Sequence, residues 1–159
     1  MNRLALLPLA ILLVLTACTT RYIGNSMIED NEENREILHV IEAYRRAVED
    51  RDIQKILDLT SASYFEDPGT PGDPSDDYDK AGLREKLEET FAQIEDLTLR
   101  IDPRKVEFSE DRSRVFVEYR YDLRFRMILP SASEWRETQD LKRVELKRED
   151  GTWRFVAGI

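Results

Sequence analysis

The two residue types that most often carry catalysis or bind metals, histidine and cysteine, occur once each in this 159-residue chain. The histidine, His39, follows Ile37 by two positions in a segment with helical spacing, about 200° further round the helix axis. His39 therefore lies on the polar face, away from any apolar pocket. We predict that it has no catalytic role, which leaves carboxylates and tyrosines as candidate site residues.

An acidic loop carries the start of a metal-binding pattern. Four oxygen-bearing residues alternate as calcium ligands do, at Asp73, Ser75, Asp77 and Asp79. A calcium loop needs Gly at its sixth position and Glu at its twelfth, and this chain has Tyr78 and Arg84 there. Because the stretch is also rich in Pro and Gly, we interpret it as a solvated loop and predict neither a metal nor a cofactor.

The first seventeen residues are typical of a secretory signal. A basic start with Arg3 precedes a Leu-rich run over residues 4–15, which is too short for a spanning helix. An N-terminal anchor that is never cleaved is the alternative. The next residues, Leu15-Thr16-Ala17-Cys18, resemble the lipobox of bacterial lipoproteins. That resemblance implies cleavage before Cys18 and lipidation of its thiol. Thr19 after the Cys favours, by the same analogy, the outer membrane facing the periplasm.

Lipidation of Cys18 has two consequences. No thiol remains for a disulfide, a nucleophile or a metal site. The mature chain keeps 23 of the 24 Lys and Arg residues, because Arg3 leaves with the signal, against 33 Asp and Glu, for a formal net charge of −10. That charge argues against a nucleic-acid partner. We expect a signal peptide over 1–17, a tether over 18–30 and a single domain over 31–159.

Three helices are predicted in the first half of the domain. The first begins near Asp30 or Asn31, where Asp30 and Glu33 have the spacing of a capping box. Its apolar stripe recurs at helical spacing, at Ile37, Ile41, Tyr44 and Val48. A second helix follows Asp52 and ends near Leu59, and a third spans about Asp79 to Gln93. Between them, residues 64–66 are predicted to form a brief strand.

The second half of the domain changes to a period of two, which is typical of strands. Its longest segment is 114–129, in which the odd positions from Val115 to Leu129 are apolar and the even ones mostly charged. Shorter strands surround it, one ended by Pro103 and the last preceded by an Asp150-Gly151 turn. The apolar parity changes between Leu141 and Val144, so we predict a β-bulge at Lys142-Arg143. This order predicts an α+β fold in which a cone-shaped, curved antiparallel sheet of four to five strands packs on three N-terminal helices.

Several short runs resemble the nuclear transport factor 2-like superfamily, which includes the SnoaL-like domains. They are Val40-Ile-Glu-Ala-Tyr44, Asp52-Ile53, Ile56-Leu57-Asp58-Leu59, Glu66-Asp67-Pro68-Gly69 and Glu149-Asp-Gly-Thr-Trp153-Arg-Phe155. The likeness covers nearly the whole domain and implies the cone-shaped fold. It does not imply one function, because this fold hosts enzymes, binding modules and dimerisation domains.

Within that superfamily, the first third of the domain is closest in pattern to ketosteroid isomerase. The resemblance implies that Tyr44 donates to a developing oxyanion and that Asp67 moves the proton. The isomerase also uses a protonated Asp on a later strand, and that place falls near Val144 or Glu145. Asp140 is too far upstream to replace it without a shift. Tyr44 and Asp67 have a purely structural interpretation as well, as a core residue and a turn opener.

A pocket inside the cone is predicted to be lined by aromatic and polar residues, namely Tyr44, Tyr64, Asp67, Tyr119, Tyr121 and Trp135. Glu137 and Gln139 share the parity of Trp135 and could face its mouth. The leading hypothesis is therefore a membrane-anchored envelope lipoprotein whose domain binds a small apolar ligand or a protein partner. The alternative is a proton-transfer enzyme, an isomerase or dehydratase, using Asp67 as base and Tyr44 as donor. A third hypothesis is an interaction domain with no working pocket, for which a homodimer through the sheet is possible around Phe116 and Ile128 on the charged face.

Overall fold

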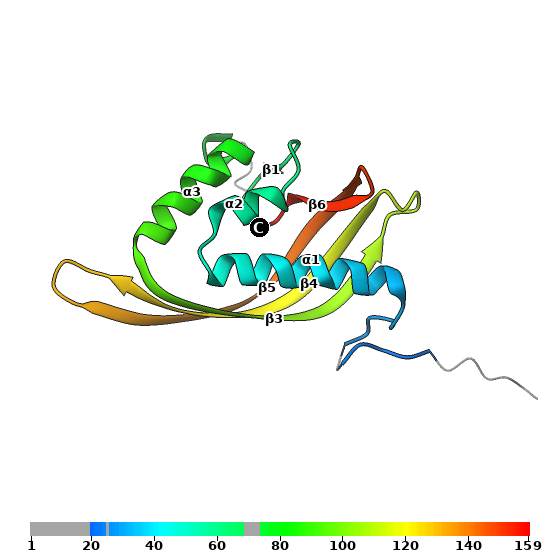
Figure 1. The fold of residues 1–159 in the computed structure, drawn as a ribbon, viewed down its shortest axis with the longest axis horizontal. Helices are drawn as coiled ribbons and strands as arrows, with labels where there is room; N and C mark the ends of the chain where they lie inside the picture. Colours follow the sequence, from blue (N-terminus) through cyan, green and yellow to red (C-terminus); the bar gives the residue numbers. More distant parts are fainter. Residues whose placement is uncertain (1–19, 25, 69–73) are drawn as a thin grey trace, which may run out of the picture.

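The computed structural model describes residues 20–24, 26–68 and 74–159 (Figure 1). The predicted signal peptide, the lipobox and Cys18 lie outside the described residues, as does Asp73 of the acidic loop. The described part folds as helices laid over the concave side of one long, curved sheet (Figure 1).

The three predicted helices are present, each capped by a side chain at its start. They are α1 (Glu32–Glu49), α2 (Ile53–Asp58) and α3 (Lys80–Ala92). Asp52 and Asp79 accept hydrogen bonds from the first-turn amides of α2 and α3. The cap of α1 is Asn31, whose side chain accepts from the Asn34 amide, so the predicted capping box at Asp30 is off by one residue. Asp30 instead pairs with Arg35 at 2.6 Å.

Four long strands form the main sheet, in the order β3-β4-β5-β6 and antiparallel throughout. They are β3 (Ile94–Phe108), β4 (Arg114–Ile128), β5 (Ser133–Glu149) and β6 (Thr152–Ala157). A small second sheet pairs β1 (Phe65–Glu66) with β2 (Tyr78–Asp79), after a 3₁₀ turn at Pro74–Asp76. The predicted α+β class, the curvature and the strand count are confirmed.

Pro103 does not end its strand, contrary to the prediction. β3 continues through it to Phe108, with a shift in pairing between Pro103 and Lys105. A proline cannot donate to a ladder, but β3 is an edge strand with one side unpaired, and edges and bulges tolerate proline. The sheet is therefore longer at this edge than the sequence suggested.

The predicted bulge at Lys142-Arg143 is wrong. β5 pairs with β4 without a break from Ser133 to Lys147, and the irregularity lies on the β6 side, between Glu145 and Leu146. Tyr119 is consequently opposite Lys142, and Tyr121 is opposite Asp140. Because paired residues point to the same face, the even-numbered side chains of β5 join the concave face along its whole length. The odd-numbered ones, including Trp135 and Leu141, belong to the outer face.

The core lies where α1 and α2 cover the sheet. Its fully buried side chains come from both layers and include Ile37, Ile56, Val115, Val117, Val144, Leu146, Trp153 and Phe155. Ile37 and Ile41 occupy the predicted stripe of α1, and the odd-numbered residues of β4 face them. Toward the tip of the β4–β5 hairpin the sheet extends beyond the helices (Figure 1). The cavity described next lies between these two regions, beneath α1 and α3.

Candidate functional site

A cavity of about 220 Å³ lies between the helices and the concave face of the sheet. Its wall is mainly apolar and draws on α1, α3, β3, β4 and β5. The lining residues are Tyr44, Val48, Leu87, Thr90, Phe91, Ile94, Leu97, Leu99, Ile101, Tyr119, Tyr121, Leu123 and Lys142. Of the predicted pocket residues, Tyr44, Tyr119 and Tyr121 thus share one cavity.

The three tyrosines lie close together. Burial raises the pKa of Tyr44 and of Tyr119 well above the usual phenol range, and the neighbouring Tyr121 adds to both shifts. The ring of Tyr44 also packs against Phe155, with 5.2 Å between ring centroids. Both hydroxyls therefore keep their protons at neutral pH and can act as neutral hydrogen-bond donors.

Lys142 brings the one ammonium group into this wall. Its position opposite Tyr119 follows from the uninterrupted pairing of β5 with β4. Burial lowers the pKa of Lys142, and the Glu66 carboxylate acts in the opposite direction. Across the part of the chain that the structure describes, Lys142 forms no ion pair or hydrogen bond. A cation in an apolar wall without a counter-ion is costly unless something compensates its charge.

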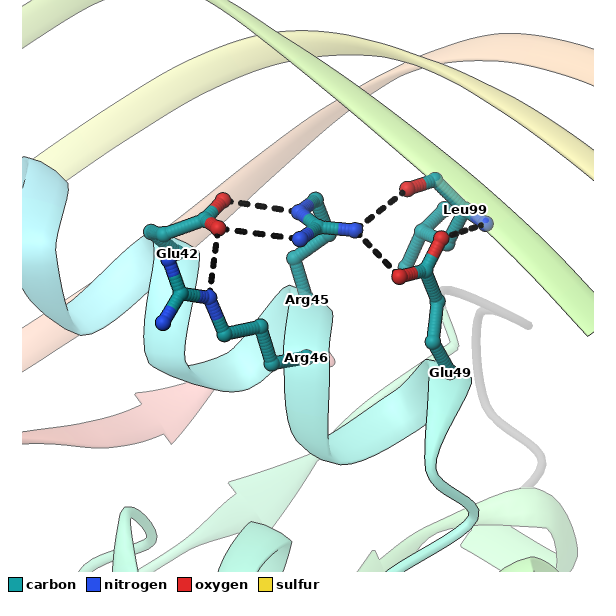
Figure 2. Close-up of polar contacts among 5 residues, drawn as sticks. All are labelled: Glu42, Arg45, Arg46, Glu49 and Leu99. Carbon is teal, nitrogen blue, oxygen red and sulfur yellow. Dashed lines mark hydrogen bonds and ion pairs between the residues drawn. The ribbon is translucent and has the colours of Figure 1, made fainter.

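The β3 wall of the cavity is held to α1 by side chains that bind its backbone (Figure 2). Glu49 accepts a hydrogen bond from the Leu99 amide at 2.9 Å, and Arg45 donates to the Leu99 carbonyl at 3.3 Å. Arg45 is itself held by Glu42 and Glu49 (Figure 2). Arg51 donates to the Ile94 carbonyl at 2.5 Å. These contacts satisfy backbone groups of an edge strand and fix one side of the cavity.

Glu66 lies on the other side of the tyrosine group. Its Oε2 accepts from the Tyr64 hydroxyl at 2.7 Å and from the Gly158 amide at 2.6 Å. Tyr64 is almost fully buried, and burial together with the Glu66 contact raises its pKa. The structure thus places Tyr64 in the core, bonded to Glu66, and not in the cavity wall.

The structure does not bring Asp67 and Tyr44 together. Asp67 is exposed and lines a separate hollow of about 320 Å³, with Phe65, Phe116 and Arg143 among its neighbours. A general base has to reach a proton of the same substrate that the oxyanion donor contacts, and the cavity around Tyr44 and the hollow around Asp67 have no lining residue in common. The predicted catalytic pair is not assembled.

Trp135 is likewise outside the cavity, so the prediction that it lines the pocket is wrong. It is 47% exposed on the outer face, with the guanidinium groups of Arg124 and Arg126 at 4.5 and 5.6 Å from its ring centroid. Glu137 lies on the same face and pairs with Arg124 at 3.4 Å. The reason is the absent bulge, which leaves the odd-numbered residues of this strand facing outward.

The outer face also carries the residues proposed for a homodimer. Ile128 is 48% exposed and Leu141 is 71% exposed, whereas Phe116 is half-buried beneath the Arg143 guanidinium, 4.5 Å from its ring centroid. A homodimer through the sheet around Phe116 and Ile128 stays a prediction, and only Ile128 of these two is exposed.

Lys142 is the site residue that sequence reasoning missed. The parity of Val144 and Leu146, carried backward without a bulge, would have placed it on the inner face. The opposite parity of Trp135 and Leu141 instead suggested an inserted residue, and hence a bulge. The available signal was the two-residue period itself, continued through a lysine whose long apolar stem can cover hydrophobic surface.

Two negative findings apply to the described residues. Within 20–24, 26–68 and 74–159, no three His, Cys, Asp or Glu side chains are grouped so as to hold a metal ion. No helix in those same ranges has the length and apolar character needed to cross a membrane.

Comparison with known proteins identifies the fold. No family model matches the chain, and no curated protein matches it in sequence. Solved structures do match. A nuclear transport factor 2-like superfamily protein from Salmonella enterica serovar Typhimurium superposes with a TM-score of 0.65 at 14% identity, over 78% of this chain and 86% of that chain. A ketosteroid isomerase-like protein from Erwinia carotovora gives 0.62 at 18% identity, over 80% and 94%.

A type 2 hexachlorocyclohexane dehydrochlorinase gives a TM-score of 0.63 at 12% identity, over 79% of this chain and 82% of that chain. Identities this low establish the fold alone. The chain therefore has a nuclear transport factor 2-like fold, a class that includes both enzymes and ligand-binding proteins. Its function has to be argued from its own cavity.

Proposed function

We propose that this protein is a bacterial envelope lipoprotein whose domain binds a small, largely apolar molecule in the cavity between α1, α3 and the sheet. The observation that supports it is the cavity itself, which is bounded by eight apolar side chains and by Tyr44, Tyr119 and Tyr121. Pockets that are mostly apolar, with a few polar groups that set orientation, are typical of small-molecule sites.

The size of the cavity limits the ligand. An apolar cavity of roughly 150 Å³ accepts a molecule of the size of benzene. At about 220 Å³, this one suits a single substituted ring or a short alkyl chain. The wall is also held in shape, because Arg45 and Glu49 of α1, and Arg51 just after its end, bind the β3 backbone. A site formed before binding loses less ordering entropy when the ligand enters.

The membrane attachment rests on the sequence. The Leu15-Thr16-Ala17-Cys18 run resembles a lipobox, and residues 18–30 would form the tether to the domain. Each buried lipid CH₂ contributes about 0.8 kcal/mol, so several acyl chains on Cys18 would hold the protein firmly to a bilayer. We place the domain in the periplasm, anchored to the outer membrane.

A proton-transfer enzyme is less well supported. The base that this function requires, Asp67, is exposed and lines a different hollow from Tyr44. The binding function needs no reacting pair, only the cavity and its donors. We therefore rank binding first.

Ligand binding is tested by filling the cavity. The full chain, isolated from its own cells under native conditions, is examined by native mass spectrometry for a bound small molecule. The Leu123→Trp variant places a bulky ring in the cavity and should lose that molecule, whereas Thr98→Trp, on the exposed outer face of β3, should keep it. Equal occupancy in both variants, or no bound molecule and no hit in a broad NMR screen, would rule out this function.

Anchoring is tested separately by labelling. In a bacterium fed a palmitate analogue, the full chain should incorporate the label and sediment with membranes. The Cys18→Ala variant should do neither. Labelling that persists in Cys18→Ala would show that the lipid, if any, is attached elsewhere.

A further inference from the structure

The cavity contains a positive charge that its own wall does not neutralise. Lys142 is on the concave face, opposite Tyr119, and lines a mainly apolar wall. An ammonium group withdrawn from water is stabilised by an opposite charge, and an unpaired one is expensive. If no protein group neutralises Lys142, the ligand has to carry the opposite charge.

Two carboxylates of the protein lie near enough to be considered, and neither pairs with Lys142. Glu66 is committed elsewhere, since its Oε2 accepts from the Tyr64 hydroxyl and the Gly158 amide, and it lines the separate hollow. Asp140 is exposed, and its Oδ1 accepts from the Leu141 amide at 2.8 Å. No ion pair to Lys142 is formed by any residue in the ranges that the structure describes.

The neighbouring hydroxyls are also available. Tyr44 and Tyr119 line the same cavity, and within the described chain neither hydroxyl is hydrogen-bonded to another protein group. Each keeps its proton, so each can donate. An ammonium group and two phenol donors around one volume form a site that complements an oxyanion, because charge-assisted hydrogen bonds to such a group are among the strongest in proteins.

We propose that the cavity selects small amphipathic carboxylates, with the carboxylate held by Lys142, Tyr44 and Tyr119 and the apolar body packed against Leu87, Leu97 and Leu99. This inference rests on the ligand-binding function proposed above and adds the chemical class of the ligand. The volume of about 220 Å³ restricts the body to a ring with a short substituent or a short chain. The carboxylate replaces the water that would otherwise solvate the ammonium group.

The inference is tested with two probes that have the same shape and differ in charge, 4-ethylbenzoate and its neutral amide, 4-ethylbenzamide. Each is titrated calorimetrically at neutral pH into the full chain in a mild detergent, with a titration into detergent alone as blank. Wild-type protein should bind the benzoate at least about tenfold more tightly than the amide. Lys142→Met should bring the ratio of the two affinities close to one, and Lys142→Arg, which retains the charge, should restore a preference for the benzoate.

A matched control uses the same strand. Lys147→Met removes a lysine from the outer face of β5, where it pairs with Glu149, and should leave the ratio unchanged. If the wild type binds both probes equally, or if the preference survives in Lys142→Met, the carboxylate inference is wrong while the binding function stands. If the wild type binds neither probe and the NMR screen also finds no ligand, both proposals are wrong.

Discussion

The two halves of the concave face of β4 share one sequence pattern and have different environments. Near its start, Val115 and Val117 are 0% exposed and Tyr119 is 2% exposed. Further along, Leu123 and Phe125 continue the same alternation but are only half-buried. We call these the closed half and the open half. The first packs against α1 and α2. The second borders the cavity and leads toward the β4–β5 hairpin, whose tip extends past the helices (Figure 1).

The difference shows that burial depends on coverage as well as on periodicity. In the closed half, α1, α2 and β6 supply partners such as Ile37, Ile56 and Phe155, and the inner row becomes core. In the open half, Leu123 borders unfilled space beneath α1 and α3, and that space is the cavity. We infer that the closed half provides the stability that lets the open half keep an unfilled volume.

The largest effect expected from this comparison is on stability. Leu146→Ala, at a fully buried position of the closed half, should lower the free energy of unfolding by about 2–5 kcal/mol, because it removes packed methylene groups and leaves a void. Leu123→Ala makes the same chemical change in the open half and should cost less than about 1.5 kcal/mol, since that side chain is half-exposed and borders a space already present. Urea unfolding of both variants measures the difference. Equal losses would mean that the two halves do not differ in packing.

A smaller effect is expected on the outer face. Trp135→Ala removes a ring that stacks under Arg124 and Arg126, and such exposed contacts contribute about 0.5–1 kcal/mol. The affinity for any cavity ligand should not change, because Trp135 and the cavity are on opposite faces. Unfolding and calorimetric titration of the same variant test both statements. A loss of affinity would mean that Trp135 does contact the ligand, as the sequence predicted.

The smallest effect concerns the α1–β3 wall of the open half. The Arg45 hydrogen bond lowers the pKa of Glu42 from 4.5 to about 2. A pKa that is lower in the folded state adds stability above the unfolded value, near pH 4.5, and this contribution is lost as the pH falls toward 2. Because Glu42 is 41% exposed, solvent screening reduces the contribution to about 0.5 kcal/mol.

Glu42→Gln should therefore be slightly less stable than wild type at about pH 7, and the two should converge at about pH 2. Urea unfolding at several pH values measures this convergence. Glu88→Gln is a control, because Glu88 is an exposed residue of α3 at 4.0 Å from Arg84 and should show almost no difference at any pH. If the stability difference between Glu42→Gln and wild type became larger at lower pH, the Glu42 carboxylate would not stabilise the fold in the way described.

Local patterns were enough to predict the secondary structure and the fold class. Helical spacing along α1, the cap at Asp52 and the long alternation of β4 depend on neighbours within a few residues. Tyr44, Tyr119 and Tyr121 could be placed on inward faces for the same reason, and the structure puts them in one cavity. The resemblance of short runs to nuclear transport factor 2-like domains agreed with the architecture, and the solved structures bear out that fold.

The position of each side chain in the site required the tertiary structure. Whether Lys142 or Trp135 faces inward depends on how β5 pairs with β4, and a shift of one residue would exchange their faces. Pro103 stays within a strand because β3 is an edge, and Asp67 and Tyr44 line different hollows. The alternation of residue types is a local property of the chain. Strand register, edge position and helix coverage arise from contacts between segments far apart in sequence, and these contacts determined which residues surround the cavity.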